Sequence, residues 1–394
     1  MLTLLLFLLI FSVLVLVHEA GHFIVAKKCG MKVEEFGMGL PPRAWTIWTD
    51  RSGTKYTLNW IPFGGFVRLL GESDNPKSPA DKEADPDYAK RLADPGNYAL
   101  HPLWQRIAVV VAGVVMNLLL AIVLLTGVFS VGFTPLAIVD DHALPFSSYL
   151  IQSDSFAKAN GTLKINQDPT GIPVEKVEPG SVAEQAGLLV GDRIVAIGEA
   201  RTLNGVDVSQ ALFDGRGKEV SLTVKRAGEE KTFQATLLPD QPFGVYITPD
   251  IEVVPLRFAP HVAFVKASEE VAKQTVLTVV LLGDVVAKLV SSGAVPEGVA
   301  GPVGIFQMTG QVSQAGAVPT LIFVALLSVS LAVMNIMPFP ALDGGRFLFL
   351  LVELVTRRRP NPRTESIIHA MGFVILLLVI GLITFNDIGR LFAA

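Results

Sequence analysis

The feature that most constrains this chain is a group of ionisable side chains at the end of an apolar N-terminal segment. Residues 2–17 are apolar apart from Thr3 and Ser12, and His18-Glu19-Ala20-Gly21-His22 follows directly. Two imidazoles and a carboxylate at membrane depth are costly unless they face a protein interior or a metal ion. On a helix, residues four positions apart share a face, so His18 and His22 can bind one ion. We therefore expect other segments of the chain to enclose this helix face.

The spacing of these residues is the HExxH pattern of zinc peptidases, in which two histidines bind the metal and the glutamate is the general base. The catalytic residue would then be Glu19, and Zn²⁺ would be the cofactor. The alternative is a pair of core histidines in a membrane helix, and it leaves Glu19 without a role at a similar depth. Catalytic zinc takes three protein ligands and an open position for water, so a third ligand must come from elsewhere.

Composition indicates a membrane protein with soluble segments. The 394 residues are 51% hydrophobic and 17% charged, with a mean hydropathy of +0.50, and this average is too apolar for an ordinary soluble protein. The net charge of −4 provides no basic surface for nucleic acid. The single cysteine, Cys29, excludes an intramolecular disulfide framework.

Apolar runs predict about four transmembrane helices. The first, in residues 1–30, lacks a basic n-region and a cleavage site, so we interpret it as a retained helix rather than a signal peptide. The others lie at 107–133, within 301–345 at about 320–337, and at 367–394. Residues 72–106 and 346–366 are expected to be polar loops between these helices.

Two further segments are expected at the membrane. Residues 31–71 alternate apolar and polar side chains between glycines, which predicts a β-structure that either enters the membrane or forms an ordinary hairpin domain. Residues 257–300 have helical spacing with charges on one side, which predicts amphipathic helices on the membrane surface.

The polar insert at 134–256 contains a compact α+β module at about 171–239. The order of its elements, and the stretch PGSVAEQAGLLVGDRIVAIG above all, resembles a PDZ domain. Such domains bind extended peptides by strand addition. A glycine-rich carboxylate-binding loop is poorly matched by residues 169–172, so gating or size filtering is an equal alternative to capture of a chain end.

The third metal ligand is predicted to be Asp343. The segment NIMPFPALDGG contains Pro338 and Pro340, which break a helix, and it brings Asp343 near the membrane between flexible residues. The alternative is a solvated turn aspartate. A second polar residue at membrane depth, Asn117, needs a partner there. A helix–helix hydrogen bond and a substrate-binding role are equally compatible with its position.

Basic residues predict the orientation of the helices. The positive-inside rule puts Arg357, Arg358, Arg359 and Arg363 in the cytoplasm. Counting helices backwards then puts the insert outside the cytoplasm, and it puts the metal motif and Asp343 near the cytoplasmic side.

The motifs together resemble the site-2 protease family, and its regulator-of-sigma-E protease branch in particular. The resemblance is carried by HExxH, LNWIPFGGFVRLLGE, WQRIAVVVAGVVMN, GPVGI, NIMPFPALDGG and FNDIGRLF. It implies that His18, His22 and Asp343 bind zinc, that Glu19 is catalytic and that Asn335 helps to hold the substrate. It also implies a membrane-reentrant β-loop at about 31–71. Relatives in enterobacteria carry two PDZ domains, whereas this sequence has room for one.

We therefore expect a multi-pass protein of the bacterial inner membrane with an extracytoplasmic PDZ-like insert. Its predicted function is an intramembrane zinc endopeptidase that cleaves transmembrane segments, such as those of anti-sigma factors or signal-peptide remnants. A non-catalytic, membrane-anchored PDZ scaffold or chaperone is the alternative, and a zinc-dependent transporter is a third class. The expected partners are transmembrane substrates and lipid, and the oligomeric state is left open.

Overall fold

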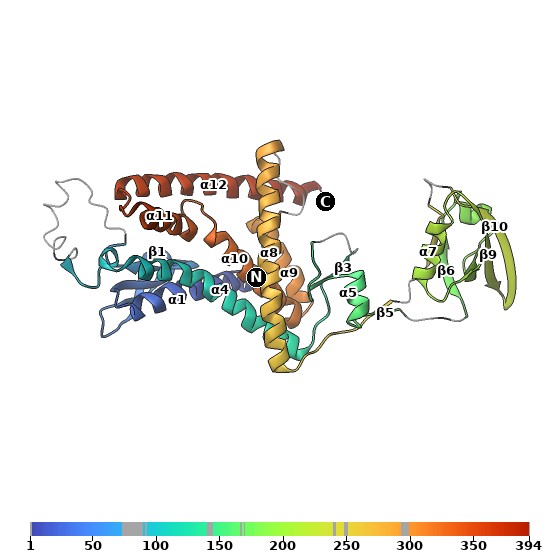
Figure 1. Cartoon of the computed structure of the whole chain (residues 1–394), viewed down its shortest axis with the longest axis horizontal. Coiled ribbons are helices and arrows are strands. Elements are labelled where there is room, and N and C mark those ends of the chain that lie inside the picture. The colour runs from blue at the N-terminus through green and yellow to red at the C-terminus, as the bar shows by residue number, and fades with distance from the viewer. Residues whose placement is uncertain are drawn as a thin grey trace. The chain divides into compact units, whose positions relative to one another are not determined.

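The computed structural model describes residues 2–72, 90, 93–139, 145–165, 168, 170–238, 242–247, 251–292 and 299–393 (Figure 1). The chain divides into two compact units. Unit 1 comprises Met1–Phe133 and Arg257–Ala394, and unit 2 comprises Thr134–Leu256.

Unit 1 is built mainly from helices. They are α1 (Leu2–Lys28), α4 (Leu103–Val131), α8 (Pro260–Ser292), α9 (Pro302–Gln314), α10 (Ala317–Ile336), α11 (Asp343–Thr356) and α12 (Pro362–Ala393). Within the described residues, four of them, α1, α4, α10 and α12, are long and apolar enough to cross a membrane. The predicted set of about four transmembrane helices is therefore confirmed.

The ends of these helices follow from local sequence. Helix α1 finishes with Lys27 and Lys28 in its last turn, and Gly30 then adopts a φ of +79°, a conformation open to glycine. Helix α10 ends because Met337 is extended, as expected for a residue that precedes a proline. The chain is thus free to turn before α11 begins at Asp343.

A bulged antiparallel sheet packs against α1. Its strands are β1 (Val33–Thr49) and β2 (Lys55–Leu69). Both strands double back, so that Phe36 pairs with Val67 on one side and with Tyr56 on the other. The buried carboxylate of Glu35 accepts hydrogen bonds from Arg43 and Thr57 and holds the folded-back segments together.

The sheet reaches the helices through a small apolar core formed by Ala26, Met31, Val33, Leu69 and Val109. Within the described residues, the segment Gly65–Leu69 pairs with β1 only. Among the described residues, this segment is therefore an edge strand of the sheet, and a β-carbon on Gly65 would lie within 4.0 Å of Glu19 and Val15 of α1.

Three helices differ from what the sequence predicts. Residues 260–292 form a single helix, α8, which packs on α4 and α10. Its location on a membrane surface stays a prediction. Helices α9 and α11 were not anticipated, because each is short and follows a Gly- and Pro-containing segment that indicates a break.

Unit 2 contains a sheet in the order β10-β9-β7-β6-β11, with β8 (Ala200–Arg201) paired to β7. Its main strands are β6 (Ile172–Val177), β7 (Arg193–Ile197), β9 (Glu219–Arg226), β10 (Glu229–Thr236) and β11 (Val245–Ile247). Helices α6 (Val182–Gln185) and α7 (Gly205–Asp214) accompany the sheet. The apolar core includes Ile172, Leu188, Ile194, Leu222 and Val224. This sheet-rich unit is compatible with the predicted PDZ-like domain.

The boundaries of the module differ from those expected. Strand β11 extends the sheet beyond residue 239, the expected end of the module. The part before residue 171, expected to be a loop, contains β3 (Ala137–Val139), β4 (Ile151–Ser153), α5 (Asp154–Ala159) and β5 (Leu163–Ile165). Three-residue strands are too short to show a period of two in the sequence. Strand β5 pairs with β12 (Ile251–Val253), so it depends on a partner far along the chain.

Candidate metal centre

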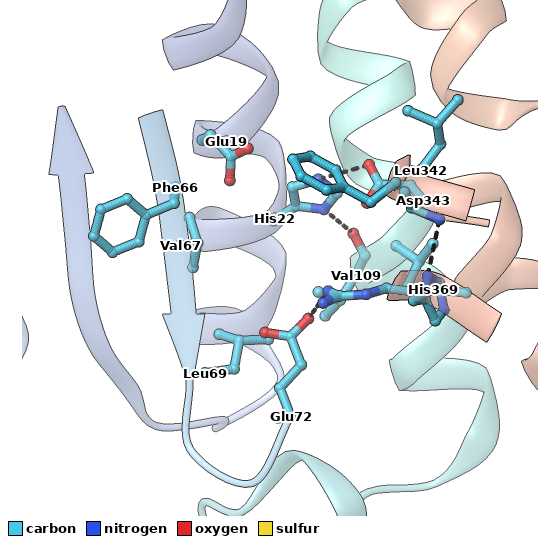
Figure 2. Close-up of a pocket in the computed structure, with 14 residues that line it drawn as sticks. Glu19, His22, Phe66, Val67, Leu69, Glu72, Val109, Leu342, Asp343 and His369 are labelled. Carbon is cyan, nitrogen blue, oxygen red and sulfur yellow. Dashed lines mark hydrogen bonds and ion pairs between the residues drawn. The ribbon is translucent and has the colours of Figure 1, made fainter. Parts of the chain in front are cut away.

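The HExxH residues lie on α1 and face the other helices of unit 1. His18 is buried, with 4% of its surface exposed, and His22 lies one turn further along with its ring centroid 4.8 Å from that of His18. Glu19 is half-buried and lines the adjacent pocket. Figure 2 shows Glu19 and His22 side by side on this helix.

Asp343 approaches both histidines from α11. Its Oδ2 atom lies 2.8 Å from Nε2 of His18 and 3.1 Å from Nε2 of His22. The two Nε2 atoms lie 3.2 Å apart. The first residue of α11 thus contacts a motif 325 positions earlier in the chain.

These three residues fit a metal ion. Ligand atoms at zinc–ligand distances of about 2.0–2.1 Å in a tetrahedron lie roughly 3.3 Å apart. The distances here are a few tenths of an ångström shorter, so small side-chain movements would admit an ion. Two imidazoles and one carboxylate are also the donor set of a catalytic zinc site, which leaves a fourth position open.

The remaining ring nitrogen of His22 supports this fit. Its Nδ1 atom lies 2.7 Å from the carbonyl oxygen of Val109 on α4, and a carbonyl only accepts. The proton of a neutral ring is therefore on Nδ1, and Nε2 presents its lone pair toward Asp343. This arrangement orients metal-binding histidines in proteins generally.

At His18, the group beside Nδ1 is the side chain of Asn117. The side chain of Asn117 is fully buried, and its Nδ2 atom lies 3.3 Å from Nδ1 of His18. Its Oδ1 atom is buried without a hydrogen-bond partner among the described residues. Ser328 of α10 donates a hydrogen bond to the backbone carbonyl of Asn117 at 2.8 Å.

Two glycines permit this close packing. A β-carbon on Gly113 of α4 would lie 2.6 Å from ring atoms of both His18 and His22. A β-carbon on Gly21 would lie 2.7 Å from the backbone carbonyl carbon of Ala112. The backbones of α1 and α4 therefore approach each other directly at the metal motif.

A cavity of about 430 Å³ opens beside the three residues. Glu19, His22 and Asp343 line it, together with Phe66 and Val67 of β2. Figure 2 shows Phe66 and Val67 on the strand beside the helix that carries Glu19 and His22. The cavity also contains an ion pair between Glu72 and Arg346.

The structure also shows where the two asparagines singled out in the sequence lie. Nδ2 of Asn335 lies 3.4 Å from Nε2 of His18, and its side chain is half-buried. Asn117 is enclosed between helices, and neither asparagine is among the described residues that line the cavity. Both asparagines contact His18, Asn117 at its Nδ1 atom and Asn335 at its Nε2 atom.

Sequence reasoning missed several contributors to this site. The carbonyl of Val109 and the absent side chain of Gly113 carry no motif, because they matter only through the approach of α1 to α4. His369 lies outside any motif in the sequence. It lines the same cavity and accepts a hydrogen bond from the backbone N–H of Ala341 at 3.0 Å.

Unit 2 has a cavity of its own, of about 260 Å³. Helix α7 contributes Ser209, Leu212 and Phe213 to it, and Gly244 and Val245, the first residue of β11, also line it. Gly244 has a φ of +81°. A glycine in the left-handed conformation thus directly precedes the edge strand β11, far along the chain from residues 169–172, which match such a loop poorly in the sequence.

Comparison with known proteins finds relatives that match nearly the whole chain. The chain is 29% identical to the regulator of sigma-E protease RseP of Escherichia coli, with 98% of each chain covered. It is 31% identical to a putative zinc metalloprotease of Clostridium perfringens, with 97% of each covered. It is 28% identical to the zinc metalloprotease RasP of Oceanobacillus iheyensis over the whole of both chains. Residues 6–379 match the model of peptidase family M50, and the chain therefore belongs to that family, the site-2 proteases.

Proposed function

We propose that this M50 protease cleaves transmembrane segments of membrane proteins at a zinc ion bound by His18, His22 and Asp343. The observation that carries the proposal is the convergence of one ligand atom from each of these residues within 4.8 Å of one another. Their partly buried position beside a cavity supports it further.

The bound zinc would polarise the scissile carbonyl and lower the pKa of a water molecule. Glu19 would accept the proton of that water and later deliver it to the leaving amine. Its position on the cavity wall, one residue from His18, supports this role. Gly65 of β2 faces Glu19, since a β-carbon there would lie 3.7 Å from Cγ of Glu19.

Asn117 would orient His18. When Nε2 of His18 faces the metal, the neutral ring carries its proton on Nδ1. A half-turn of the Asn117 amide brings Oδ1, the buried atom without a partner, into position to accept that proton. This role accounts for the complete burial of Asn117 better than a substrate-binding role does.

The substrate would bind as an extended strand. A transmembrane helix must unwind before cleavage, because its carbonyls are hydrogen-bonded, and the freed backbone groups need new partners in a membrane. The segment Gly65–Leu69 can supply them by strand pairing, and it borders the cavity. The amide of Asn335, beside His18, would donate a hydrogen bond to a substrate carbonyl.

We further infer a location in the bacterial inner membrane, with the metal centre near the cytoplasmic side. Lys27 and Lys28 at the end of α1 and the Arg-rich segment after α11 support this orientation. Unit 2 would then be extracytoplasmic, where its cavity and edge strand would bind or filter substrate chains. An anti-sigma factor or a signal-peptide remnant fits such a site, and the former fits the name of the Escherichia coli relative.

The decisive experiment uses purified full-length protein, its zinc content and cleavage of a model transmembrane peptide with and without a chelator. We expect bound zinc and chelator-sensitive cleavage. Glu19→Gln should retain zinc and lose roughly 10²–10⁴-fold in activity, since a general base contributes about that much. Asp343→Asn, the matched control, should lose both zinc and cleavage.

The other function classes give different results in the same experiment. A membrane-anchored scaffold would bind no zinc and form no product. A zinc transporter would bind zinc without cleaving the peptide. Cleavage by Glu19→Gln at the wild-type rate would remove Glu19 from the mechanism.

A further inference from the structure

The loop that carries Asp343 has a strained backbone. Residues 337–342 connect α10 to α11, and Ala341, two positions before Asp343, has a φ of +82°. This left-handed conformation is unfavourable for a residue that has a side chain. Such a conformation persists only where surrounding contacts hold it.

Helix α12 provides those contacts. The backbone N–H of Ala341 donates to Nδ1 of His369 at 3.0 Å. One turn further along the same helix, a β-carbon on Gly372 would lie 2.5 Å from the carbonyl oxygen of Pro340, so the helix backbone packs directly on the loop. Figure 2 shows His369 next to the segment that contains Leu342 and Asp343.

The His369 ring also contacts the helix that follows the loop. Its centroid lies 5.5 Å from that of Phe349 on α11. One side chain therefore touches both the strained residue before Asp343 and the helix that begins with it. Nε2 of His369 is buried without a hydrogen-bond partner among the described residues. Among these residues, the hydrogen bond from Ala341 is therefore the one that orients the ring.

We propose that His369 is a positioning residue for the metal centre, which holds the Ala341 turn so that Asp343 reaches His18 and His22. Catalytic geometry must be held to about 0.5 Å, and a loop alone rarely holds it so closely. The fourth membrane helix thus becomes part of the metal site although it contributes no ligand. The inference rests on the proposed zinc site.

The test compares variants of the full-length protein by zinc affinity, measured in competition with a chelator, and by the visible absorption of the Co²⁺-substituted protein. His369→Leu removes the acceptor and should weaken zinc binding about 10- to 100-fold, the usual effect of losing a group that orients a ligand. Its Co²⁺ spectrum should change. His369→Asn should stay close to wild type, because its amide oxygen can take the place of Nδ1.

Two controls separate positioning from packing. Met371→Leu changes an exposed side chain on the same helix and should leave zinc affinity and cleavage unchanged. His369→Gln places its oxygen further out, near the position of Nε2, and should weaken zinc binding as His369→Leu does. If the Leu variant does not fold, the comparison of Asn with Gln decides the question.

Wild-type zinc affinity in His369→Leu, or equal affinities of the Asn and Gln variants, would overturn the inference. Failure of the proposed zinc site looks different. In that case Asp343→Asn would bind zinc as tightly as wild type, whatever residue stands at 369.

Discussion

Gly113 lies on α4 directly against the rings of His18 and His22, with room for a hydrogen atom but not for a methyl group. We expect Gly113→Ala to displace both rings and to abolish stoichiometric zinc binding and cleavage. The physical reason is overlap of the new β-carbon with ring atoms only 2.6 Å away, in a segment where the helix backbones already touch. Metal analysis of the purified variant measures the effect.

The same helix offers a matched control. Gly127 has nothing within 4 Å of its would-be β-carbon, and alanine favours a helix over glycine by about 1 kcal/mol. Gly127→Ala should therefore retain zinc and activity. Full zinc occupancy in Gly113→Ala would show that the rings can move apart without cost.

At the scale of elements, the attachment of α11 to α4 supports the ligand that α11 carries. Arg106 of α4 donates to both carboxylate oxygens of Glu353, at 3.0 and 2.5 Å, and Arg359 lies 3.3 Å away. The hydrogen bonds from Arg106 hold the pKa of the Glu353 carboxyl below its usual value. Glu353 is therefore a fixed anchor for α11 at neutral pH.

A lowered pKa in the folded state makes this anchor dependent on pH. Its contribution is complete above the unfolded-state pKa of about 4.3 and is lost as pH falls through the lower folded-state value. We expect Glu353→Gln to reduce the free energy of unfolding by roughly 1–3 kcal/mol at pH 7. The difference between variant and wild type should shrink on acidification below about pH 4.

Thermal unfolding in detergent at several pH values tests this expectation. Asp284→Asn, which disrupts the exposed ion pair with Lys288 on α8, is the control. It should change stability by less than about 1 kcal/mol. A Glu353→Gln effect that is small and independent of pH would contradict the anchor.

At the scale of the whole molecule, the candidate metal centre joins the first helix to a segment more than 300 residues later. A ligand that binds only the folded state stabilises it, by about 4 kcal/mol at a free concentration 1,000 times its dissociation constant. We therefore expect a chelator to lower the unfolding temperature of the wild type. Asp343→Asn should start lower and should not respond to the chelator.

Unit 2 supplies the internal comparison, because it has its own apolar core. Leu222→Ala, in that core, should destabilise unit 2 by about 2–5 kcal/mol while the protein keeps its zinc.

Chelator sensitivity in Asp343→Asn equal to that of wild type would show that the stabilising metal is bound elsewhere.

Much of the candidate site could be predicted from local sequence. The spacing of His18 and His22 places both on one helix face, and the prolines before Asp343 indicate a break where a ligand can leave a helix. The long apolar runs likewise predicted the membrane helices. Helices α9 and α11 could not be predicted in this way, because each has too few periodic residues next to strong breakers.

The role of single residues was harder to predict. Asn117 was recognisable as a polar group that needs a partner, but only the packing of α4 on α1 shows that the partner is His18. His369 lies outside any motif, and only the tertiary structure shows that it contacts the loop that carries Asp343. Gly113 gave no signal at all, since a glycine in a helix has many explanations.

The sequence by itself determined the membrane helices, the candidate metal-binding residues and the presence of a sheet-rich insert, because hydropathy, periodicity and chain breakers act over neighbouring residues. The tertiary structure alone decided which backbone carbonyl orients His22, where a missing side chain makes room for the rings, and how α12 holds the Ala341 turn. Those features depend on approaches of a few ångströms between segments far apart in the chain. No local pattern specifies such approaches, since they arise only when the helices pack.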